Sequence, residues 1–223
     1  MPYSETPFLA QLVNFFAALL LLIAFAMLAQ RRILSLIHLF AAQGLVLALS
    51  TAVVAVISGQ HHLFFSAVLT VFLKVWLLPY VLHRLLIRLG LRREVEYVLN
   101  IPTTMLLGLG LVVFAFNLAA PISAMASTIT KSLIGFALAS VLLAFLMMIT
   151  RRKAITQVIG FLAMENGLFF AATSATYGMP MVVELGIALD VLIGTAITGI
   201  FFFQIREAFE SLDLSHLEQL KEK

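Results

Sequence analysis

Residues Gly160 to Gly194 read GFLAMENGLFFAATSATYGMPMVVELGIALDVLIG. This stretch contains two apolar runs of helical length, joined by a short Tyr-Gly-Met-Pro turn at 177–180. Glu165 lies in the middle of the first run, and Glu184 and Asp190 lie in the second. Carboxylates are costly to insert into a bilayer, so acids at this depth mark candidate functional sites. We expect this pair of helices to carry part of a proton path, which the other helices hold in place.

The composition around this stretch is that of a membrane protein. Of 223 residues, 62% are hydrophobic and 11% are charged, and the mean hydropathy is +1.09. These values predict a polytopic, all-α protein whose surroundings are the lipid bilayer. The chain has no cysteine, which excludes disulfides, iron–sulfur clusters and thiolate-bound metals within it. The net charge of +3 predicts no nucleic-acid partner, because the basic residues fall at helix ends.

The chain contains enough long apolar runs for seven transmembrane helices of about 20 residues or more. The first run lacks a preceding basic segment and is too long for a signal peptide, so we expect a retained helix. A single membrane domain is expected over 1–205, with a cytoplasmic tail over 206–223. The predicted spans are 8–29, 33–57, 62–87, 98–118, 127–149, 154–176 and 181–204.

The basic residues predict the orientation of these helices. They follow the odd-numbered spans, at Arg31, Arg32, Arg84, Arg88, Arg92, Arg93, Arg151, Arg152, Lys153, Arg206, Lys221 and Lys223. The loops on the opposite side, at 58–60, 117–126 and 177–180, contain no lysine or arginine. The positive-inside rule therefore places the N-terminus outside and the C-terminus in the cytoplasm.

Two lysines remain inside predicted spans. Lys74 lies near the middle of the third span, and Lys131 lies about one turn inside the outer end of the fifth. Pro79 follows Lys74 by five residues and lacks a backbone donor, so we expect the helix to kink there. Lys74 is a candidate member of the proton path or, alternatively, a cation that neutralises Asp190 or Glu165. Lys131 is a candidate that could also extend its amine to the membrane surface.

Asp190 is the leading acid of the second helix. Gly186, Gly194 and Thr198 fall at four-residue steps from it, so they share its helical face and let another helix approach closely. This pattern predicts a carboxylate that takes up and releases a proton within a packing seam. The alternative is a structural ion pair with Lys74 or Lys131.

Glu165 is followed by Asn166 and Gly167, which favour interhelical hydrogen bonding and close approach. We interpret Glu165 as a second member of the path; the alternative is a protonated side chain that joins two helices. Glu184 lies near the outer end of its helix. It is either the outer member of the path or a side chain that reaches the lipid headgroups.

His38 and His83 fall inside predicted spans and raise the alternative of a haem-binding anchor, although ordinary interfacial residues explain them better. His61 and His62 are adjacent, which is poor spacing for metal ligands. We therefore expect no cofactor and no metal in this chain. The tail from Ser211 to Lys223 suits either a frayed end or a strip that docks on a partner subunit.

Four motifs together resemble the hydrogenase-4 component E family. They are MENG at 164–167, VELGIALD at 183–190, FLKVWLLP at 72–79 and SLDLSHLEQLK at 211–221, and the likeness extends over nearly the whole chain. The resemblance implies a membrane subunit of an energy-converting, complex I-like hydrogenase or formate hydrogenlyase complex. Its partners would be antiporter-like membrane subunits in the inner membrane of a prokaryote, with the redox chemistry in other chains.

The last three predicted helices, 127–205, also resemble the K-type subunit of complex I and the C-type subunit of multi-subunit sodium/proton antiporters. Asp190, with Ile193 and Gly194 after it, matches a buried glutamate in the last helix of the K-type subunit. Asn166 matches the asparagine after the other buried glutamate. That glutamate would fall near Leu162, whereas the acid in this chain is Glu165, one turn away.

Three kinds of function follow. The first is a non-catalytic subunit that contributes buried charges to proton translocation. The second is a structural module whose buried ions only fix helix register while it joins antiporter-like subunits, or a component of a cation/proton antiporter. The third is a self-sufficient transporter, which the lack of an evident repeat pair disfavours.

Overall fold

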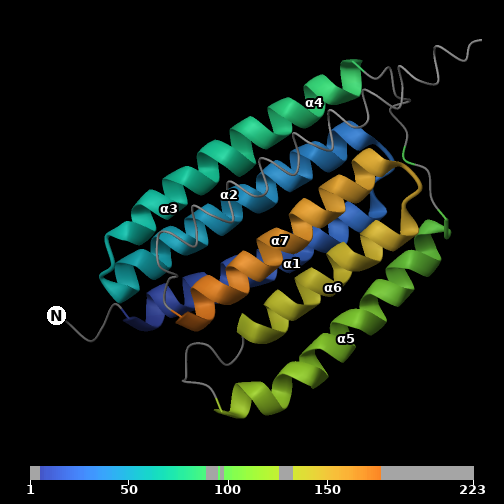
Figure 1. Ribbon diagram of the computed structural model, residues 1–223. Coiled ribbons are helices and arrows are strands. Elements are labelled where there is room, and N and C mark those ends of the chain that lie inside the picture. The colour runs from blue at the N-terminus through green and yellow to red at the C-terminus, as the bar shows by residue number, and fades with distance from the viewer. Residues whose placement is uncertain (1–5, 89–94, 96–97, 126–132, 177–223) are drawn as a thin grey trace, which may run out of the picture.

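The computed structural model describes residues 6–88, 95, 98–125 and 133–176, and every regular element within these ranges is a helix. In chain order the elements are α1 (Thr6–Ala29), α2 (Ile33–Ser58), α3 (His62–Thr70), η1 (Val71–Leu77), α4 (Leu78–Arg88), α5 (Ile101–Met125), α6 (Leu133–Thr150) and α7 (Ala154–Thr176). The three consecutive elements α3, η1 and α4 form one continuous helical rod over residues 62–88, called the rod below (Figure 1).

Within the described residues, six helices are long and apolar enough to cross a bilayer. Their bounds are Phe8–Ala29, Ile33–Ser58, His62–Ile87, Ile101–Pro121, Leu133–Thr150 and Ile155–Thr173. They agree with the first six predicted spans to within a few residues, which confirms the all-helical membrane fold for this part of the chain. The predicted seventh span, 181–204, and the predicted tail, 206–223, lie outside the described residues.

One predicted loop is wrong over most of its length. The sequence predicted a loop from Asn117 to Ala126, but α5 continues to Met125 with Pro121 inside it. Proline removes one backbone donor and often ends a helix. Here the residues around it are mostly alanine and larger apolar side chains, with no glycine to stop the helix. The helix therefore continues past the proline.

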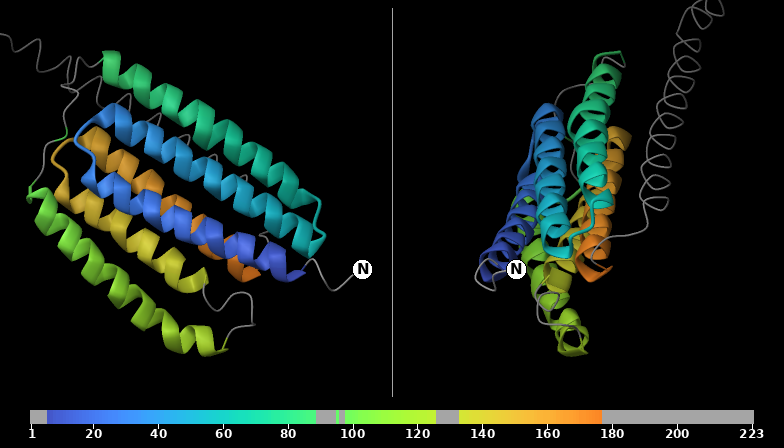
Figure 2. Two further views of the ribbon diagram at one scale, coloured as in Figure 1. Left: turned by 180° about the vertical axis from the view of Figure 1, so that it is seen from behind. Right: turned by 90° about the vertical axis from the view of Figure 1, so that its left-hand side faces the viewer.

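The helices are arranged so that the α3–η1–α4 rod and α5 form opposite edges of the molecule (Figure 1), and the view from behind shows the same order (Figure 2). Between the edges, α2 packs against α1, α7 and the rod, while α6 packs against α7, α5 and α1. Short connections make chain neighbours antiparallel. One of them turns at Gly59, whose φ of +68° ends α2 in the left-handed conformation that glycine adopts without strain.

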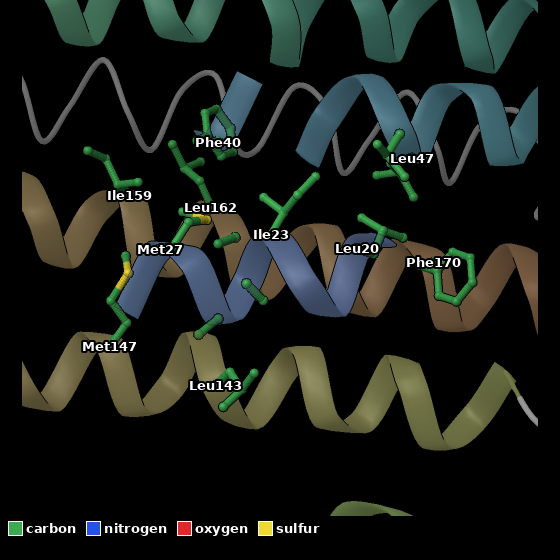
Figure 3. Close-up of a cluster of buried hydrophobic side chains, with 14 of the residues drawn as sticks. Leu20, Ile23, Met27, Phe40, Leu47, Leu143, Met147, Ile159, Leu162 and Phe170 are labelled. Carbon is green, nitrogen blue, oxygen red and sulfur yellow. The ribbon is translucent and has the colours of Figure 1, made fainter. Parts of the chain in front are cut away.

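The apolar core lies where α1, α2, α6 and α7 meet. Figure 3 shows side chains of all four helices converging there, among them Leu20 and Met27 of α1, Phe40 of α2, Leu143 of α6 and Leu162 of α7. The span in α7 is 61% buried and the span in α5 is 22% buried. The helix that carries Glu165 is thus central, whereas α5 exposes large apolar side chains, as expected of a helix that faces lipid.

The rod contains a seven-residue π-helical segment, Val71–Leu77, around Lys74. At its end the backbone N–H of Leu78 donates to the carbonyl of Leu73, five residues back. The wider π turn comes immediately before Pro79, which lacks an N–H of its own. The sequence predicted a kink near Pro79; the structure shows a π segment that carries the buried lysine, within a continuous rod.

Candidate functional site

The site is a buried ion pair between the rod and the central helix α7. Lys74 Nζ lies 2.8 Å from Oε1 and 2.6 Å from Oε2 of Glu165. The side chains are only 5% and 11% exposed. The ammonium therefore donates to both carboxylate oxygens inside an apolar bundle. Of the two acids that the sequence left open as partners of Lys74, the structure places Glu165 there.

An aromatic ring lies against the lysine of the pair. The ammonium of Lys74 lies 5.2 Å from the centre of the Phe169 ring, one turn beyond Glu165 on α7. A cation over the face of an aromatic ring gains electrostatic stabilisation, which is larger when water is excluded. Phe169 thus forms a cation–π contact with the lysine side of the pair.

Helix α2 approaches the pair closely because of a glycine. A Cβ atom added at Gly44 would lie 3.0 Å from Lys74 Cβ and 3.5 Å from the Lys74 carbonyl oxygen. A larger side chain at this position would collide with the backbone of η1 as well as with the lysine stem. Gly44 therefore sets the distance between α2 and the π segment, and with it the position of the amine.

A second polar contact begins at the residue that follows Glu165 on α7. Asn166 Nδ2 donates to Gln43 Oε1 at 3.2 Å. Both side chains are fully buried. Since Gln43 precedes Gly44 and Asn166 follows Glu165, this amide pair joins α2 to α7 beside the lysine–glutamate pair. The expectation that Asn166 hydrogen-bonds across helices agrees with this geometry.

Gly167 brings α7 close to α6. A Cβ atom there would lie 2.9 Å from Val141 Cγ2 and 3.2 Å from the Val141 backbone nitrogen. The central helix therefore meets its neighbour almost backbone to backbone. This close packing holds α7, and so the carboxylate of Glu165, in a fixed position.

The chemistry open to this arrangement is proton exchange. An amine and a carboxylate 2.6 Å apart can share a proton, either as an ion pair or as a neutral amine and acid. A nearby charge changes the balance, because Coulomb interactions are only weakly screened in the interior. The pair can therefore hold or pass on a proton in response to a field.

Several predicted site residues lie outside the described residues. They are Lys131, Glu184 and Asp190, together with the packing residues Gly186, Gly194 and Thr198. The structure thus brings together Lys74, Glu165 and Asn166 from the predicted set. It adds Gln43, Gly44 and Phe169, which the sequence analysis missed; the only sequence signal was a Gln-Gly dipeptide within the apolar run of α2.

Arg151 also differs from its predicted surroundings. The sequence analysis placed it among the charges of a cytoplasmic loop, but its side chain is one of the largest fully buried ones. Its guanidinium donates to the carbonyls of Met27 at 3.0 Å, Leu28 at 2.8 Å and Gln30 at 3.3 Å. These carbonyls lie at or just beyond the end of α1, where carbonyls lack the usual helical donor; the Met27 carbonyl also accepts from the backbone N–H of Gln30 at 3.3 Å. Arg151 therefore caps α1 from the α6–α7 connection.

The two histidines considered for a haem lie on different helices, His38 on α2 and His83 on α4, and both side chains are exposed. Among the described residues no three histidine, aspartate or glutamate side chains gather as a metal-binding group. The buried polar groups of the described residues include the lysine–glutamate pair, the amide pair and Arg151.

The chain is similar to the protein Rv0085 of Mycobacterium tuberculosis, with 30% identity over 212 residues, which cover 95% of this chain and 96% of that one. It is also similar to the hydrogenase-4 component E of Escherichia coli K12 and of Shigella flexneri, with 28% identity over 101 residues.

The match to component E covers 45% of this chain and 47% of the component. The likeness to component E is thus narrower than the nearly full-length resemblance expected from the motifs. No family model matches the chain, and no solved structure does. By its nearly full-length match, the chain belongs to the family of the mycobacterial protein Rv0085, and about half of it is homologous to component E of hydrogenase-4.

Proposed function

We propose that this chain is a non-catalytic membrane subunit of an energy-converting, complex I-like redox complex of the hydrogenase-4 type, and that it contributes buried charges to proton translocation. The complex would lie in the inner membrane of a prokaryote, beside antiporter-like subunits. The match to component E and the six apolar helices of the described residues support membership of such a complex.

The observation that carries the proposed role is the buried Lys74–Glu165 ion pair. Burying two ionised groups in the middle of apolar helices costs desolvation free energy. Replacing such a pair by hydrophobic side chains of similar volume often leaves the protein as stable or makes it more stable. Stability alone therefore does not account for the pair. Its place on the central helix α7 and on a π segment, a feature frequent at functional sites, supports a role in ion movement.

Coupling to a redox reaction would operate through the electric field. One unit charge at about 4 Å is worth about 4 kcal/mol at an effective dielectric constant near 20. A tenfold change in proton affinity corresponds to only about 1.4 kcal/mol. A charge that appears in a neighbouring subunit would therefore be sufficient to change the protonation of the pair.

The remaining predicted members would extend the path beyond this pair. Asp190 and Glu184 would continue it along the predicted seventh span, and Lys131 would lie toward its outer end. In the proposed orientation the N-terminus is outside and the C-terminus is cytoplasmic. The basic residues in the loops after the odd-numbered spans support this orientation.

A structural role is the rival account. The interhelical ion pair and amide pair would then serve only to fix the register of η1, α2 and α7, and the subunit would join antiporter-like chains. This account predicts that a complex which assembles without the pair translocates protons normally.

Purification of the affinity-tagged chain from its native membrane tests the membership. Co-purification of antiporter-like subunits with redox subunits is the expected result, and antiporter subunits alone would favour a cation/proton antiporter. Recovery of the chain by itself, active in liposomes, would contradict the proposal. In the assembled complex, Asp190→Asn is expected to abolish proton uptake by vesicles; normal uptake would remove Asp190 from the path.

A further inference from the structure

The amide pair beside the ion pair has hydrogen-bonding capacity that its own contact does not use. Asn166 Nδ2 donates to Gln43 Oε1 at 3.2 Å. Gln43 Nε2 and Asn166 Oδ1, however, have no hydrogen-bond partner among the described residues, and both atoms are buried. One donor and one acceptor thus remain unsatisfied at the same interface between α2 and α7.

This count does not depend on how the two amides are oriented. The oxygen and nitrogen of an amide side chain are assigned from their hydrogen bonds, and either group could be turned over. If both are turned over, Gln43 donates to Asn166, and again one acceptor and one donor are left. Two amides that share a single hydrogen bond always leave one NH2 group and one carbonyl oxygen without a partner.

The surroundings on the two helices do not satisfy these groups. Along α2, Phe40 and Leu47 lie one turn to either side of Gln43 on the same face, and along α7, Leu162 and Phe170 flank Asn166 in the same way. All four are at most 1% exposed, and Figure 3 shows them in the core of the bundle. The amide pair is therefore a polar layer between apolar layers.

We propose that Gln43 and Asn166 form an internal water-binding site. A water molecule satisfies both groups at once, because its oxygen accepts from Gln43 Nε2 and one of its O–H groups donates to Asn166 Oδ1. Buried waters typically occupy such positions, where they hydrogen-bond to polar groups that would otherwise be unsatisfied. An unsatisfied buried donor or acceptor is costly, so the water also stabilises the interface.

The bound water extends the reach of the ion pair; this step rests on the proposed function. After its contacts with the two amides, the water still has one O–H group and one lone pair. Glu165 and Gly44, next to the two amides in sequence, place the site beside the carboxylate and the lysine backbone. In this proposal the water links the ion pair to further members of the path, and Gln43 and Asn166 act as positioning residues.

The water itself is tested in the unaltered complex. An experimental structure of the full chain within its native assembly, at a resolution that shows ordered water, is expected to contain one within hydrogen-bond distance of Gln43 Nε2 and Asn166 Oδ1. Absence of density there, or a protein side chain in its place, would overturn the water site. This measurement needs no variant and does not depend on proton translocation.

The role of the water is tested with the double variant Gln43→Leu/Asn166→Leu. It removes every unsatisfied group and leaves an apolar layer, so the complex is expected to assemble while proton uptake falls at least tenfold. Asn117→Leu is the matched control, because Asn117 is exposed on α5 and bonds only to the Val113 carbonyl of its own helix among the described residues. Normal uptake in the double variant would overturn the link to the path. Normal uptake in Glu165→Gln would instead contradict the proposed function itself.

Discussion

Lys74 Nζ lies within 2.8 Å of both carboxylate oxygens of Glu165, a residue 91 positions later in the chain. The two helices that carry these residues are therefore held together by a buried pair of charges. Removing one partner leaves the other charge buried and uncompensated, which costs about 3–5 kcal/mol in proteins of known energetics. Replacing both partners by apolar groups removes that penalty.

We therefore expect Lys74→Met and Glu165→Leu each to lower the thermal unfolding midpoint of the purified protein strongly. The double variant Lys74→Met/Glu165→Leu is expected to be clearly more stable than either single variant, with a coupling free energy of about 2 kcal/mol or more. Thermal unfolding in detergent, followed by size-exclusion chromatography, measures all four proteins. Additive effects of the two substitutions would show that the pair does not form.

Gly44 provides a test of the packing that positions the lysine. A Cβ atom at this position is already tight against Lys74 Cβ at 3.0 Å, and Lys74 Cβ is fixed to the helix backbone and cannot swing away, so the larger leucine would force α2 and η1 apart. We expect Gly44→Leu to destabilise the protein by about 1–3 kcal/mol, as overpacking does. Gly110→Leu is the matched control, because nothing lies within 4 Å of its added Cβ and leucine favours the helix. Equal effects of the two substitutions would contradict the close approach of α2.

Arg151 is expected to stabilise the junction between α1 and the α6–α7 connection. Arg151→Met removes three hydrogen bonds from a charged donor to the end of α1. A hydrogen bond to a charged group contributes about 1.5–3 kcal/mol to the free energy of unfolding, so we expect a clear loss of stability. Arg152→Met, at the exposed neighbouring position, is expected to change stability by less than about 0.5 kcal/mol. Thermal unfolding separates the two variants, and a similar loss in both would show that burial of Arg151 is unimportant.

The orientation can be measured directly because the chain has no cysteine. His61→Cys lies in the connection before α3 and Arg152→Cys in the connection before α7, and both positions are exposed. We expect a membrane-impermeant maleimide to label His61→Cys in spheroplasts and Arg152→Cys only after permeabilisation. The reverse pattern would place the N-terminus in the cytoplasm.

The spans of the described residues were predictable from the sequence because each is a long apolar run, and the end that was placed wrongly, that of α5, has neither a charged residue nor a glycine to mark it. The side of each helix that faces the core was harder to predict from the sequence. A helix that is apolar all round, such as α2, gives little periodicity to show which side is buried. The burial of Gln43 and the contact of Gly44 with Lys74 depend on packing between segments far apart in the sequence.

Lys74 and Glu165 could be identified individually, since each is an isolated charge in an apolar run. Their pairing required the structure, because the sequence also contains Asp190 as a possible partner. The sequence did not predict the π segment around Lys74; Pro79 predicted only a kink nearby. Arg151 lies in the connection where the sequence placed it, but its burial depends on three carbonyls near the end of α1, which are far away in the sequence and accept from its guanidinium.

Proton uptake by inverted membrane vesicles that contain the assembled complex with Glu165→Gln is the most direct test of the proposed role. Glutamine keeps the size of the side chain but cannot bind and release a proton, so uptake is expected to fall at least about tenfold, in keeping with the loss of a positioned proton carrier. Arg152→Gln is the control and is expected to leave uptake unchanged. Normal uptake by an assembled Glu165→Gln complex would contradict the central claim.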